Sequence, residues 1–517
     1  MINLDGAVAA KYDATSEVAK DLNAIAGALA KKDPTLWGKA AEVEARVRLN
    51  WIDLPKSSRE LLPQLDALSA WARSNNLTNF ILCGMGGSSL APEVIAKTFN
   101  RALTILDTTD PAQIAAAIPT DLATTLVIVG SKSGSTIETA SQKSFFENLF
   151  VNAGLNPRDH FVIVTDPQSP LDKASRESGY RVINADPNVG GRFSALSAFG
   201  LVPAALIGID VSVLLDDADI ASQTFSEPNS PAIKLATLLF EQCKENFSLT
   251  DEKSSVKGLG DWIEQLVAES TGKDQRGRLP IVVESSAAKV SGPALRIGFA
   301  PGVADLNVIA SLGEHFILWE WVTSLLCRAL KVDPFNQPNV TEAKERTGQL
   351  LEEWRASGIP AITPVISTAN FDIYASGSPL TPGDAIRALL SPNQKYLAVM
   401  AYLNRVADHH ICEIRNVLAE KTKIGVTFGW GPRFLHSTGQ FHKGGTQNGA
   451  FLQITGESAK DLEIPYKEFS FHTLLMAQAL GDGAAIQSRE LPLVRIHLKN
   501  REAGIAEILE LVKNLLN

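Results

Sequence analysis

The sequence predicts an α/β protein with mainly parallel sheets, and three observations support this class. From residue 79 onward, short apolar runs alternate with turn residues and helix-like segments, an arrangement typical of βαβ units. The runs, such as TTLVIV at 124–129, are continuously apolar rather than alternating, as expected for strands that are covered on both faces. The length of 517 residues exceeds what one hydrophobic core normally serves, so two or more domains are expected.

The first 75 or so residues are expected to be helical, because two alanine-rich stretches place apolar residues at helical spacing. Five strand-like runs follow, separated by helix-like segments or turns: NFILCG, ALTILDT, TTLVIVG, HFVIVTD and YRVINA. A second set contains the strand-like LPIVVESS and LRIGFA, a long apolar helix at 311–330 and an amphipathic helix at 340–356.

A third region follows Pro364. It is expected to contain a helix at 394–422 and the strands IGVTFG, AFLQIT and LVRIHL. Proline and glycine interrupt the chain at 225–231 and 358–364, which marks plausible boundaries. The predicted division is an N-terminal helical segment (1–75), a first α/β domain (76–224), a second (232–358) and a C-terminal α/β region (365–517).

Composition excludes several classes of protein. A hydrophobic content of 45% and a charged content of 20% are those of a soluble globular protein, and a net charge of −9 argues against a nucleic-acid partner. The four cysteines lie far apart, so neither a disulfide scaffold nor a structural zinc site is expected. No stretch reaches the roughly 20 apolar residues of a membrane span, and the N-terminus lacks the apolar core of a signal peptide. We therefore expect a cytoplasmic protein.

Two segments are candidates for an anion site. CGMGGSSL (83–90) and GSKSGSTIET (130–139) both follow predicted strands, and open parallel sheets bind ligands beyond the carboxyl ends of their strands. The glycines allow close backbone approach, while the hydroxyls and the helix N-terminus favour an anion. Helix capping by Ser and Thr explains either segment alone equally well, but two such segments favour binding. Neither matches a nucleotide motif, which points to a phosphate on a small molecule.

Three further side chains are candidates for chemistry. Arg192 follows two glycines, where it can act as a charge clamp or make an ordinary surface ion pair. Gln265 and Glu269 share a helix face at i, i+4, and apolar neighbours can raise a carboxylate's pKa towards that of a general base. A solvated helix-end glutamate is the commoner alternative. Gln337 lies two helical turns before Lys344. Taken alone, this segment is best interpreted as a turn followed by an exposed lysine.

Taken in order, five segments resemble the phosphoglucose isomerase family: GMGGSSL, SKSGST, GGRFSALSAFGL, QLVAESTGK and DPFNQPNVTEAK. The family is built from two doubly wound α/β/α sandwich domains of the sugar-isomerase (SIS) type, so the resemblance implies that fold for the two predicted domains. Residues 429–455, GWGPRFLHSTGQFHKGGTQNGAFLQIT, resemble the isomerase half of bifunctional transaldolase–phosphoglucose isomerases.

The resemblance implies reversible isomerisation of glucose 6-phosphate and fructose 6-phosphate through a cis-enediol, in glycolysis and gluconeogenesis, by a homodimer without cofactor or metal. Glu269 would be the proton-transfer base, Arg192 would stabilise the enediolate and Lys344 would help to open the sugar ring. The implied substrate contacts are Gly87 and Ser88 for the sugar, Ser131, Lys132, Ser133 and Thr136 for the phosphate, and Gln265 and Gln337 for hydroxyls or the phosphate side.

The ring-opening histidine departs from the family pattern. The family carries it in a GTNGQH segment and supplies it from the neighbouring subunit. Here the closest counterpart in order is His315, without the glycine-rich lead, and His442 is the next candidate, with His436 nearby. Two alternatives to the implied activity stay open: an isomerase of mannose 6-phosphate or a 6-sulfo sugar, and a non-catalytic sugar-phosphate sensor.

Overall fold

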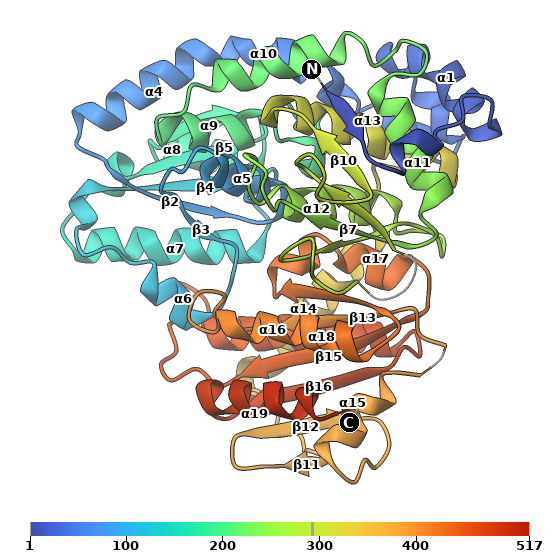
Figure 1. The fold of residues 1–517 in the computed structure, drawn as a ribbon. Helices are drawn as coiled ribbons and strands as arrows, with labels where there is room; N and C mark the ends of the chain where they lie inside the picture. The colour runs from blue at the N-terminus through green and yellow to red at the C-terminus, as the bar shows by residue number, and fades with distance from the viewer. Residues whose placement is uncertain (1, 291–293, 392, 516–517) are drawn as a thin grey trace.

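The strands of the described residues form three sheets, which follow one another along the chain except that the first strand joins the second sheet (Figure 1). The computed structural model describes residues 2–290, 294–391 and 393–515. The predicted fold class, α/β with mainly parallel sheets, N-terminal helices and a C-terminal α/β region, is confirmed. The domain boundaries proposed from the sequence stay a prediction.

The first sheet places both glycine- and hydroxyl-rich loops at one point. Its strands are β2 (Asn79–Gly84), β3 (Thr104–Leu106), β4 (Thr125–Gly130), β5 (Phe161–Thr165) and β6 (Arg181–Asn184). They are all parallel, in the order β3-β2-β4-β5-β6. Strand β2 leads to β3 on one side and β4 leads to β5 on the other, while Gly84 pairs with Gly130. The loops after β2 and β4 therefore open side by side at a topological switch point.

The strands of this sheet are continuously apolar because both faces are buried. All six residues of β4 are buried. Val127 and Val129 pack with Phe146 in one cluster, whereas Leu126 and Ile128 belong to the larger cluster on the other face. The helices of this part of the chain are α5 (Leu90–Thr98), α6 (Pro111–Ala116), α7 (Ile137–Asn152), α8 (Pro170–Glu177), α9 (Ala198–Leu206) and α10 (Val211–Ser222).

The second sheet includes a strand from the start of the chain. Its order is β1-β10-β9-β7-β8, with strands β1 (Asn3–Asp5), β7 (Asn246–Thr250), β8 (Leu279–Val282), β9 (Leu295–Gly298) and β10 (Leu306–Ile309). Strand β1 runs antiparallel to β10, so the expectation that the first 75 residues are helical was wrong at this point. None of the three residues of β1 is fully buried, and no apolar pattern marks it.

The remaining helices that precede the third sheet largely follow the predictions. They are α11 (Pro231–Gln242), α12 (Leu259–Thr271), α13 (Leu312–Leu330) and α14 (Pro338–Ser357), together with the N-terminal α1 (Glu17–Ala30), α2 (Glu42–Ala45), α3 (Leu54–Ser57) and α4 (Leu62–Ser74). The second alanine-rich stretch yields only the short α2 and neighbouring 3-10 turns.

The third sheet corrects one prediction. Its order is β11-β12-β16-β15-β13-β14, and its strands are β11 (Ile366–Ser367), β12 (Phe371–Ala375), β13 (Tyr396–Ala401), β14 (Gly425–Trp430), β15 (Gly449–Gly456) and β16 (Leu493–Leu498). The single helix predicted at 394–422 was wrong, because its first part is the internal strand β13, and the helical part is confined to a 3-10 turn (His409–Cys412) and helix α16 (Glu413–Lys421). A short apolar run buried on both faces fits a strand or a helix equally well.

Helices cover both faces of this sheet as well. Helices α15 (Pro382–Ala388), α16 and α19 (Arg501–Lys513) share one apolar cluster with it. Helices α17 (Gly439–Gly444) and α18 (Phe471–Gln487) share another. Within the described ranges, no helix combines the length and the apolar character that a bilayer crossing requires. The same residues contain no group of three or more His, Cys, Asp or Glu side chains placed to hold a metal ion.

A buried ion-pair network joins the third sheet to the rest of the molecule. Arg433, just beyond β14, is almost fully buried and contacts Glu93 as well as Asp107, with Nη1 2.6 Å from Asp107 Oδ2. Its Nη2 lies 3.3 Å from Asp261, and Arg405 Nη1 lies 3.0 Å from Glu93. Burial alone would raise the pKa of the Glu93 carboxyl, but the two guanidinium groups hold that pKa well below its ordinary value.

Replacing Arg433 by Met tests this network. We expect the free energy of unfolding to fall by about 3–5 kcal/mol, because Glu93 and Asp107 lose a buried counter-charge. The control is Arg59→Met, which breaks an ion pair whose side chains, Arg59 and Asp216, are 37% and 55% exposed and which should cost about 1 kcal/mol or less. Denaturant titrations of both variants make the comparison, and equal losses would contradict the assignment.

Candidate active site

The loop after β2 packs directly on the turn that carries Arg192. Gly86–Ser88 form one 3-10 turn (η5) and Gly191–Phe193 form another (η8). A Cβ at Gly87 would lie 1.8 Å from the carbonyl oxygen of Gly191, so only glycine allows this approach. Gly86 adopts φ +54°, the left-handed region that glycine tolerates best. The two turns are therefore held in contact, with Ser88 beside them.

Arg192 binds groups from two segments, helix α12 and the loop before α14. Its side chain is 4% exposed. Nε donates to Ser270 Oγ at 2.7 Å and Nη1 donates to Gln337 Oε1 at 2.6 Å, while Nη2 donates to two carbonyls of the loop before α14. Nη1 also lies 3.5 Å from Glu269 Oε1. The structure thus brings together Arg192, Glu269 and Gln337, which the sequence analysis singled out separately.

Glu269 lies on α12 with polar partners on both oxygens. It is 6% exposed, and its Oε2 accepts a hydrogen bond from Gln265 Nε2 at 3.1 Å, as the i, i+4 spacing predicted. The same amide nitrogen donates to the carbonyl of His436 at 2.8 Å. Gln265 Oε1 is buried and accepts no hydrogen bond from the described residues. The carboxylate therefore lies between a guanidinium and an amide, rather than among the apolar neighbours that the sequence analysis expected.

The loop after β4 folds on its own hydroxyl groups. Gly134 N donates to Ser131 Oγ at 3.1 Å, and the hydroxyls of Ser133 and Ser135 lie 2.7 Å apart. Thr136 occupies the N-cap position of α7, yet its side chain accepts no capping hydrogen bond. Helix capping therefore does not explain this hydroxyl, which accepts a long hydrogen bond of 3.5 Å from Ser131 Oγ and stands at the positive end of a 16-residue helix.

Lys132 does not present its charge to this loop. Its Nζ lies 2.8 Å from Asp166 Oδ2 and donates to the carbonyl of Val189 at 2.9 Å. The ammonium is thus already paired. The predicted electrostatic contribution of Lys132 to anion binding finds no support in this geometry, whereas its backbone remains part of the loop.

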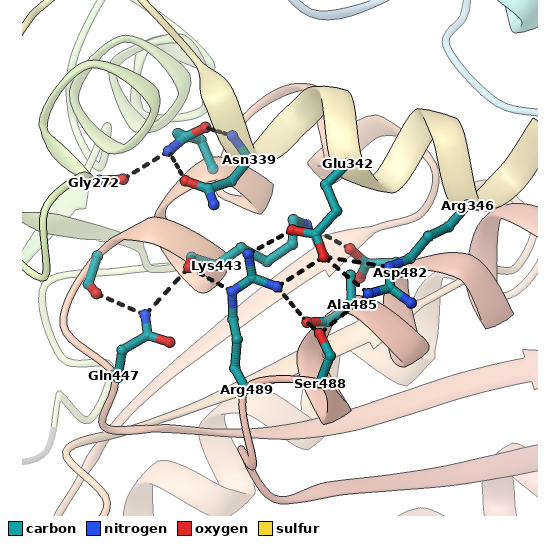
Figure 2. Close-up of polar contacts among 12 residues, drawn as sticks. Gly272, Asn339, Glu342, Arg346, Lys443, Gln447, Asp482, Ala485, Ser488 and Arg489 are labelled. Carbon is teal, nitrogen blue, oxygen red and sulfur yellow. Dashed lines mark hydrogen bonds and ion pairs between the residues drawn. The ribbon is translucent and has the colours of Figure 1, made fainter.

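Helix α14, which carries Lys344, is fastened by polar contacts to the C-terminal region (Figure 2). Gln440 of α17 donates to the carbonyl of Gly272, at the end of α12, at 3.0 Å and to Asn339 Oδ1, at the start of α14, at 2.8 Å. Further along α14, Arg489 Nη1 donates to Glu342 Oε1 at 3.2 Å. Within the C-terminal region, Lys443 and Asp482 form a fully buried ion pair, with Nζ 2.6 Å from Oδ1. Lys344 itself is exposed.

His315 and His442 are core residues. His315 is completely buried against Phe299, and neither ring nitrogen has a hydrogen-bond partner among the described residues. His442 is packed among aromatic rings, with Nδ1 3.3 Å from the hydroxyl of Tyr396. Burial lowers the pKa of each imidazole to about 3. The structure therefore argues against the prediction that His315, or next His442, opens the sugar ring.

His436 lies beside the predicted site instead. It ends the 3-10 turn Arg433–His436 (η10), and its side chain is 14% exposed. Its Nε2 lies 3.0 Å from Oε1 of Glu138, which also accepts from Gln478 Nε2 at 2.7 Å. Sequence reasoning gave Glu138 no role, although it stands in the segment GSKSGSTIET. No local signal marked Gln478.

Comparison with known proteins supports the family resemblance. Residues 60–287 match the model of the phosphoglucose isomerase family. The resemblance to phosphoglucose isomerases is confirmed over this stretch. Glucose-6-phosphate isomerase of Thermus thermophilus is 34% identical over 244 residues, which cover 44% of this chain and 57% of the relative. The enzyme of Thermosynechococcus vestitus is 36% identical over 218 residues, 39% and 41% of the two chains.

The likeness covers part of each protein. The chain spans about half the length of the curated relatives it matches. A crystal structure of a glucose-6-phosphate isomerase from Chlamydia trachomatis shares the fold at a TM-score of 0.50 and 20% identity, over 58% of this chain and 74% of that one. The phosphoglucose isomerase stretch contains the turns after β2 and β4, Arg192 and Glu269, whereas Gln337, Lys344 and His436 lie beyond it.

Gly87→Ala tests the contact between η5 and η8. The added methyl group would overlap the Gly191 carbonyl, so we expect a loss of about 1–3 kcal/mol in stability as the two turns separate. Gly191→Ala is the matched control, because a Cβ at that position meets nothing within 4 Å. Thermal unfolding of the two variants gives the comparison. Equal melting temperatures for both would show that the turns are not in contact.

His315→Leu tests the core assignment of this residue through pH. The folded pKa of about 3 lies below the ordinary 6.5, so the unfolded state takes up the proton first and stability is lost as pH falls from 6.5 towards 3. At pH 5 this effect amounts to about 2 kcal/mol, which the variant should not show. Urea titrations of both proteins between pH 8 and pH 5 measure it. Parallel curves over that range would mean that His315 is accessible to protons in the folded state.

Proposed function

We propose that this chain catalyses the reversible isomerisation of glucose 6-phosphate and fructose 6-phosphate. The observation that carries the proposal is the buried Arg192–Glu269–Gln265 cluster beside two loops at a sheet switch point. The similarity of residues 60–287 to glucose-6-phosphate isomerases supports it. As a step of glycolysis and gluconeogenesis, the reaction is proposed to take place in the cytoplasm.

Glu269 is proposed to move the proton between the two carbons. Its carboxylate removes the proton from C2 of the open-chain aldose and returns it to C1 through a cis-enediol, with no redox cofactor required. The negative charge that develops on the oxygen is stabilised by the guanidinium of Arg192, whose Nη1 is 3.5 Å from Glu269. Because both side chains are buried, water screens this interaction little.

The substrate's phosphate is proposed to bind in the loop after β4. Backbone N–H groups, the hydroxyls of Ser131, Ser133 and Thr136 and the N-terminus of α7 provide donors for phosphate oxygens. Gly87 and Ser88, on the adjacent loop, are proposed to contact the sugar. Gln265 and Gln337 offer amides at its hydroxyls, and Lys344 adds positive charge near the ring end. The paired Lys132 serves through its backbone.

Glu269→Gln is the decisive variant. Loss of the general base should lower kcat about 10²–10⁴-fold with little change in KM, because the amide keeps the size of the side chain. The matched control is Glu264→Gln on the same helix, since Glu264 lines a separate cavity. Turnover of fructose 6-phosphate in a coupled assay measures both variants. Wild-type turnover in Glu269→Gln, or none in the unmodified protein, would overturn the proposal.

The alternatives are separated by two measurements. A substrate panel that includes mannose 6-phosphate and a 6-sulfo sugar identifies the preferred sugar. Exchange of the C2 hydrogen of bound substrate in D2O distinguishes an isomerase from a sugar-phosphate sensor, because only the enediol step exchanges it. The pairing of Glu269 with Arg192 favours the isomerase, since a sensor has no need of a base beside a buried cation.

A further inference from the structure

We propose that Lys273 is a positioning residue of the isomerase reaction: with Arg192 it holds the loop of residues 333–337, and its positive charge makes the reaction depend on pH. This inference rests on the proposed isomerase function, whose mechanism gives Lys273 no role. Lys273 lies two residues beyond α12, the helix that carries Glu269, and is 3% exposed. A lysine is rarely buried to this extent unless a partner or a function requires it.

The ammonium of Lys273 binds the first residue of the loop. Its Nζ donates to the carbonyl of Asp333, the one acceptor that it has among the described residues. The carboxylate of Asp333 turns into the same loop, where Oδ1 accepts from the backbone nitrogens of Phe335 at 2.8 Å and Asn336 at 3.4 Å. Lys273 therefore fixes the residue around which the loop folds.

Arg192 binds the remainder of the same loop. Its Nη2 donates to two loop carbonyls, and its Nη1 donates to Gln337 Oε1 at 2.6 Å. Two buried cations thus share one short loop, which leads directly into α14. A displacement at Asp333 would move the acceptors of Arg192 and the amide of Gln337 together. Lys273 can therefore influence the site without touching the sugar.

The backbone around Lys273 is fixed by other contacts. The carbonyl of Gly272 accepts from Gln440 Nε2 at 3.0 Å, and a Cβ at Gly272 would lie 2.5 Å from the Cα of Phe441. The carbonyl of Lys273 accepts from the backbone nitrogen of Arg276 at 2.9 Å. These contacts do not involve the ammonium, so a change of this side chain alone should leave the segment in place.

The surroundings of Lys273 make its charge sensitive to pH. Burial, and after it the guanidinium of Arg192, lower the pKa of the Lys273 ammonium to about 7. The other groups that face it act in the opposite direction, and they are Cys327 of α13, Asp333 of the loop and Glu269 of α12. Burial raises the pKa of the Cys327 thiol to about 12, so this group is uncharged at neutral pH. Lys273 therefore titrates near neutral pH, whereas Arg192 keeps its charge.

The charge of Lys273 favours the proposed intermediate. The reaction moves a negative charge from Glu269 to the oxygens of the enediolate. Arg192 Nη1 lies 3.5 Å from Glu269 Oε1, and Lys273 adds a second positive charge within electrostatic range of both. Because these side chains are buried, water screens their charges little, and a second cation stabilises an anion at the reacting carbons.

Unfolding at several pH values tests the buried charge without reference to activity. The folded pKa of about 7 lies below the ordinary 10.5, so the unfolded state holds the proton more tightly and stability rises with pH between 7 and 10.5. Relative to Lys273→Met, we expect the equilibrium constant of unfolding of the unmodified protein to fall about tenfold per pH unit. The matched control is Lys331→Met, which replaces an exposed lysine just before the loop. An equal pH dependence of Lys273→Met and Lys331→Met would overturn the inference.

Kinetics over pH 6 to 9.5 test the role in the reaction. As pH rises through about 7, kcat/KM of the unmodified protein for fructose 6-phosphate should fall about 10- to 100-fold to a lower plateau. Lys273→Met should show the lower value throughout, while Lys331→Met should follow the unmodified protein. A lysine needed only for packing would leave the shape of the profile unchanged. A profile of Lys273→Met parallel to that of the unmodified protein would therefore contradict the inference, as would an unmodified protein whose kcat/KM does not fall.

Lys273→Arg restores the charge at every pH. We expect it to keep activity within about tenfold of the low-pH value and to lose the fall above pH 7, because a guanidinium does not deprotonate in this range. Thermal unfolding shows which variants are folded. If Lys273→Met is not folded, Lys273→Arg decides: a fall that persists in this variant overturns the inference.

The two proposals fail separately. An unmodified protein without turnover contradicts the isomerase function, and the unfolding comparison still shows whether Lys273 carries a buried charge. An active protein whose pH profile does not depend on Lys273 contradicts only the role of this lysine.

Discussion

The arrangement of the candidate site depends on the buried guanidinium of Arg192. A guanidinium keeps its charge at any physiological pH and carries five N–H donors, so burial requires that acceptors surround it. Those acceptors come from Ser270 and Glu269 on α12 and from the loop that ends at Gln337. The turn η8 belongs to the first sheet's part of the chain, whereas α12 follows β7 of the second sheet. Because the guanidinium of Arg192 needs these hydrogen-bond acceptors, helix α12 of the second sheet lies against the switch point of the first sheet.

The need of a buried guanidinium for surrounding acceptors also explains how the C-terminal region is attached. Arg433 is buried as well, and its acceptors are Glu93, Asp107 and Asp261 from the other two parts of the molecule. Removing this charge from water is favourable only where the carboxylates meet it closely, which limits the geometries that η10 can adopt. His436 follows in the same turn. Its position is therefore a consequence of matching Arg433, while Gln440 and Arg489 connect the region to α14 in parallel (Figure 2).

Local features were readable from the sequence, and long-range ones were not. The parallel strands and both loops at the switch point followed from apolar runs and from glycine–hydroxyl turns. The pairing of Gln265 with Glu269 followed from i, i+4 spacing. Strand β13 was missed, because an apolar run buried on both faces carries no period. Lys132 was expected to serve an anion, but its partner Asp166 lies 34 residues away, and Glu138 and His436 are separated by 298. No local pattern encodes such contacts.

The side-chain amide of Gln265 has a buried oxygen that can accept a hydrogen bond from a ligand. Its amide nitrogen donates both to Glu269 and to the carbonyl of His436, so its orientation is fixed by two acceptors. The same orientation leaves Oε1 buried without a donor among the described residues. A buried acceptor without a hydrogen bond costs about 1–3 kcal/mol, which a hydroxyl donated by a ligand would recover. A ligand with a hydroxyl between Glu269 and His436 would therefore be favoured over an analogue that lacks this hydroxyl, because the analogue would leave the penalty in place.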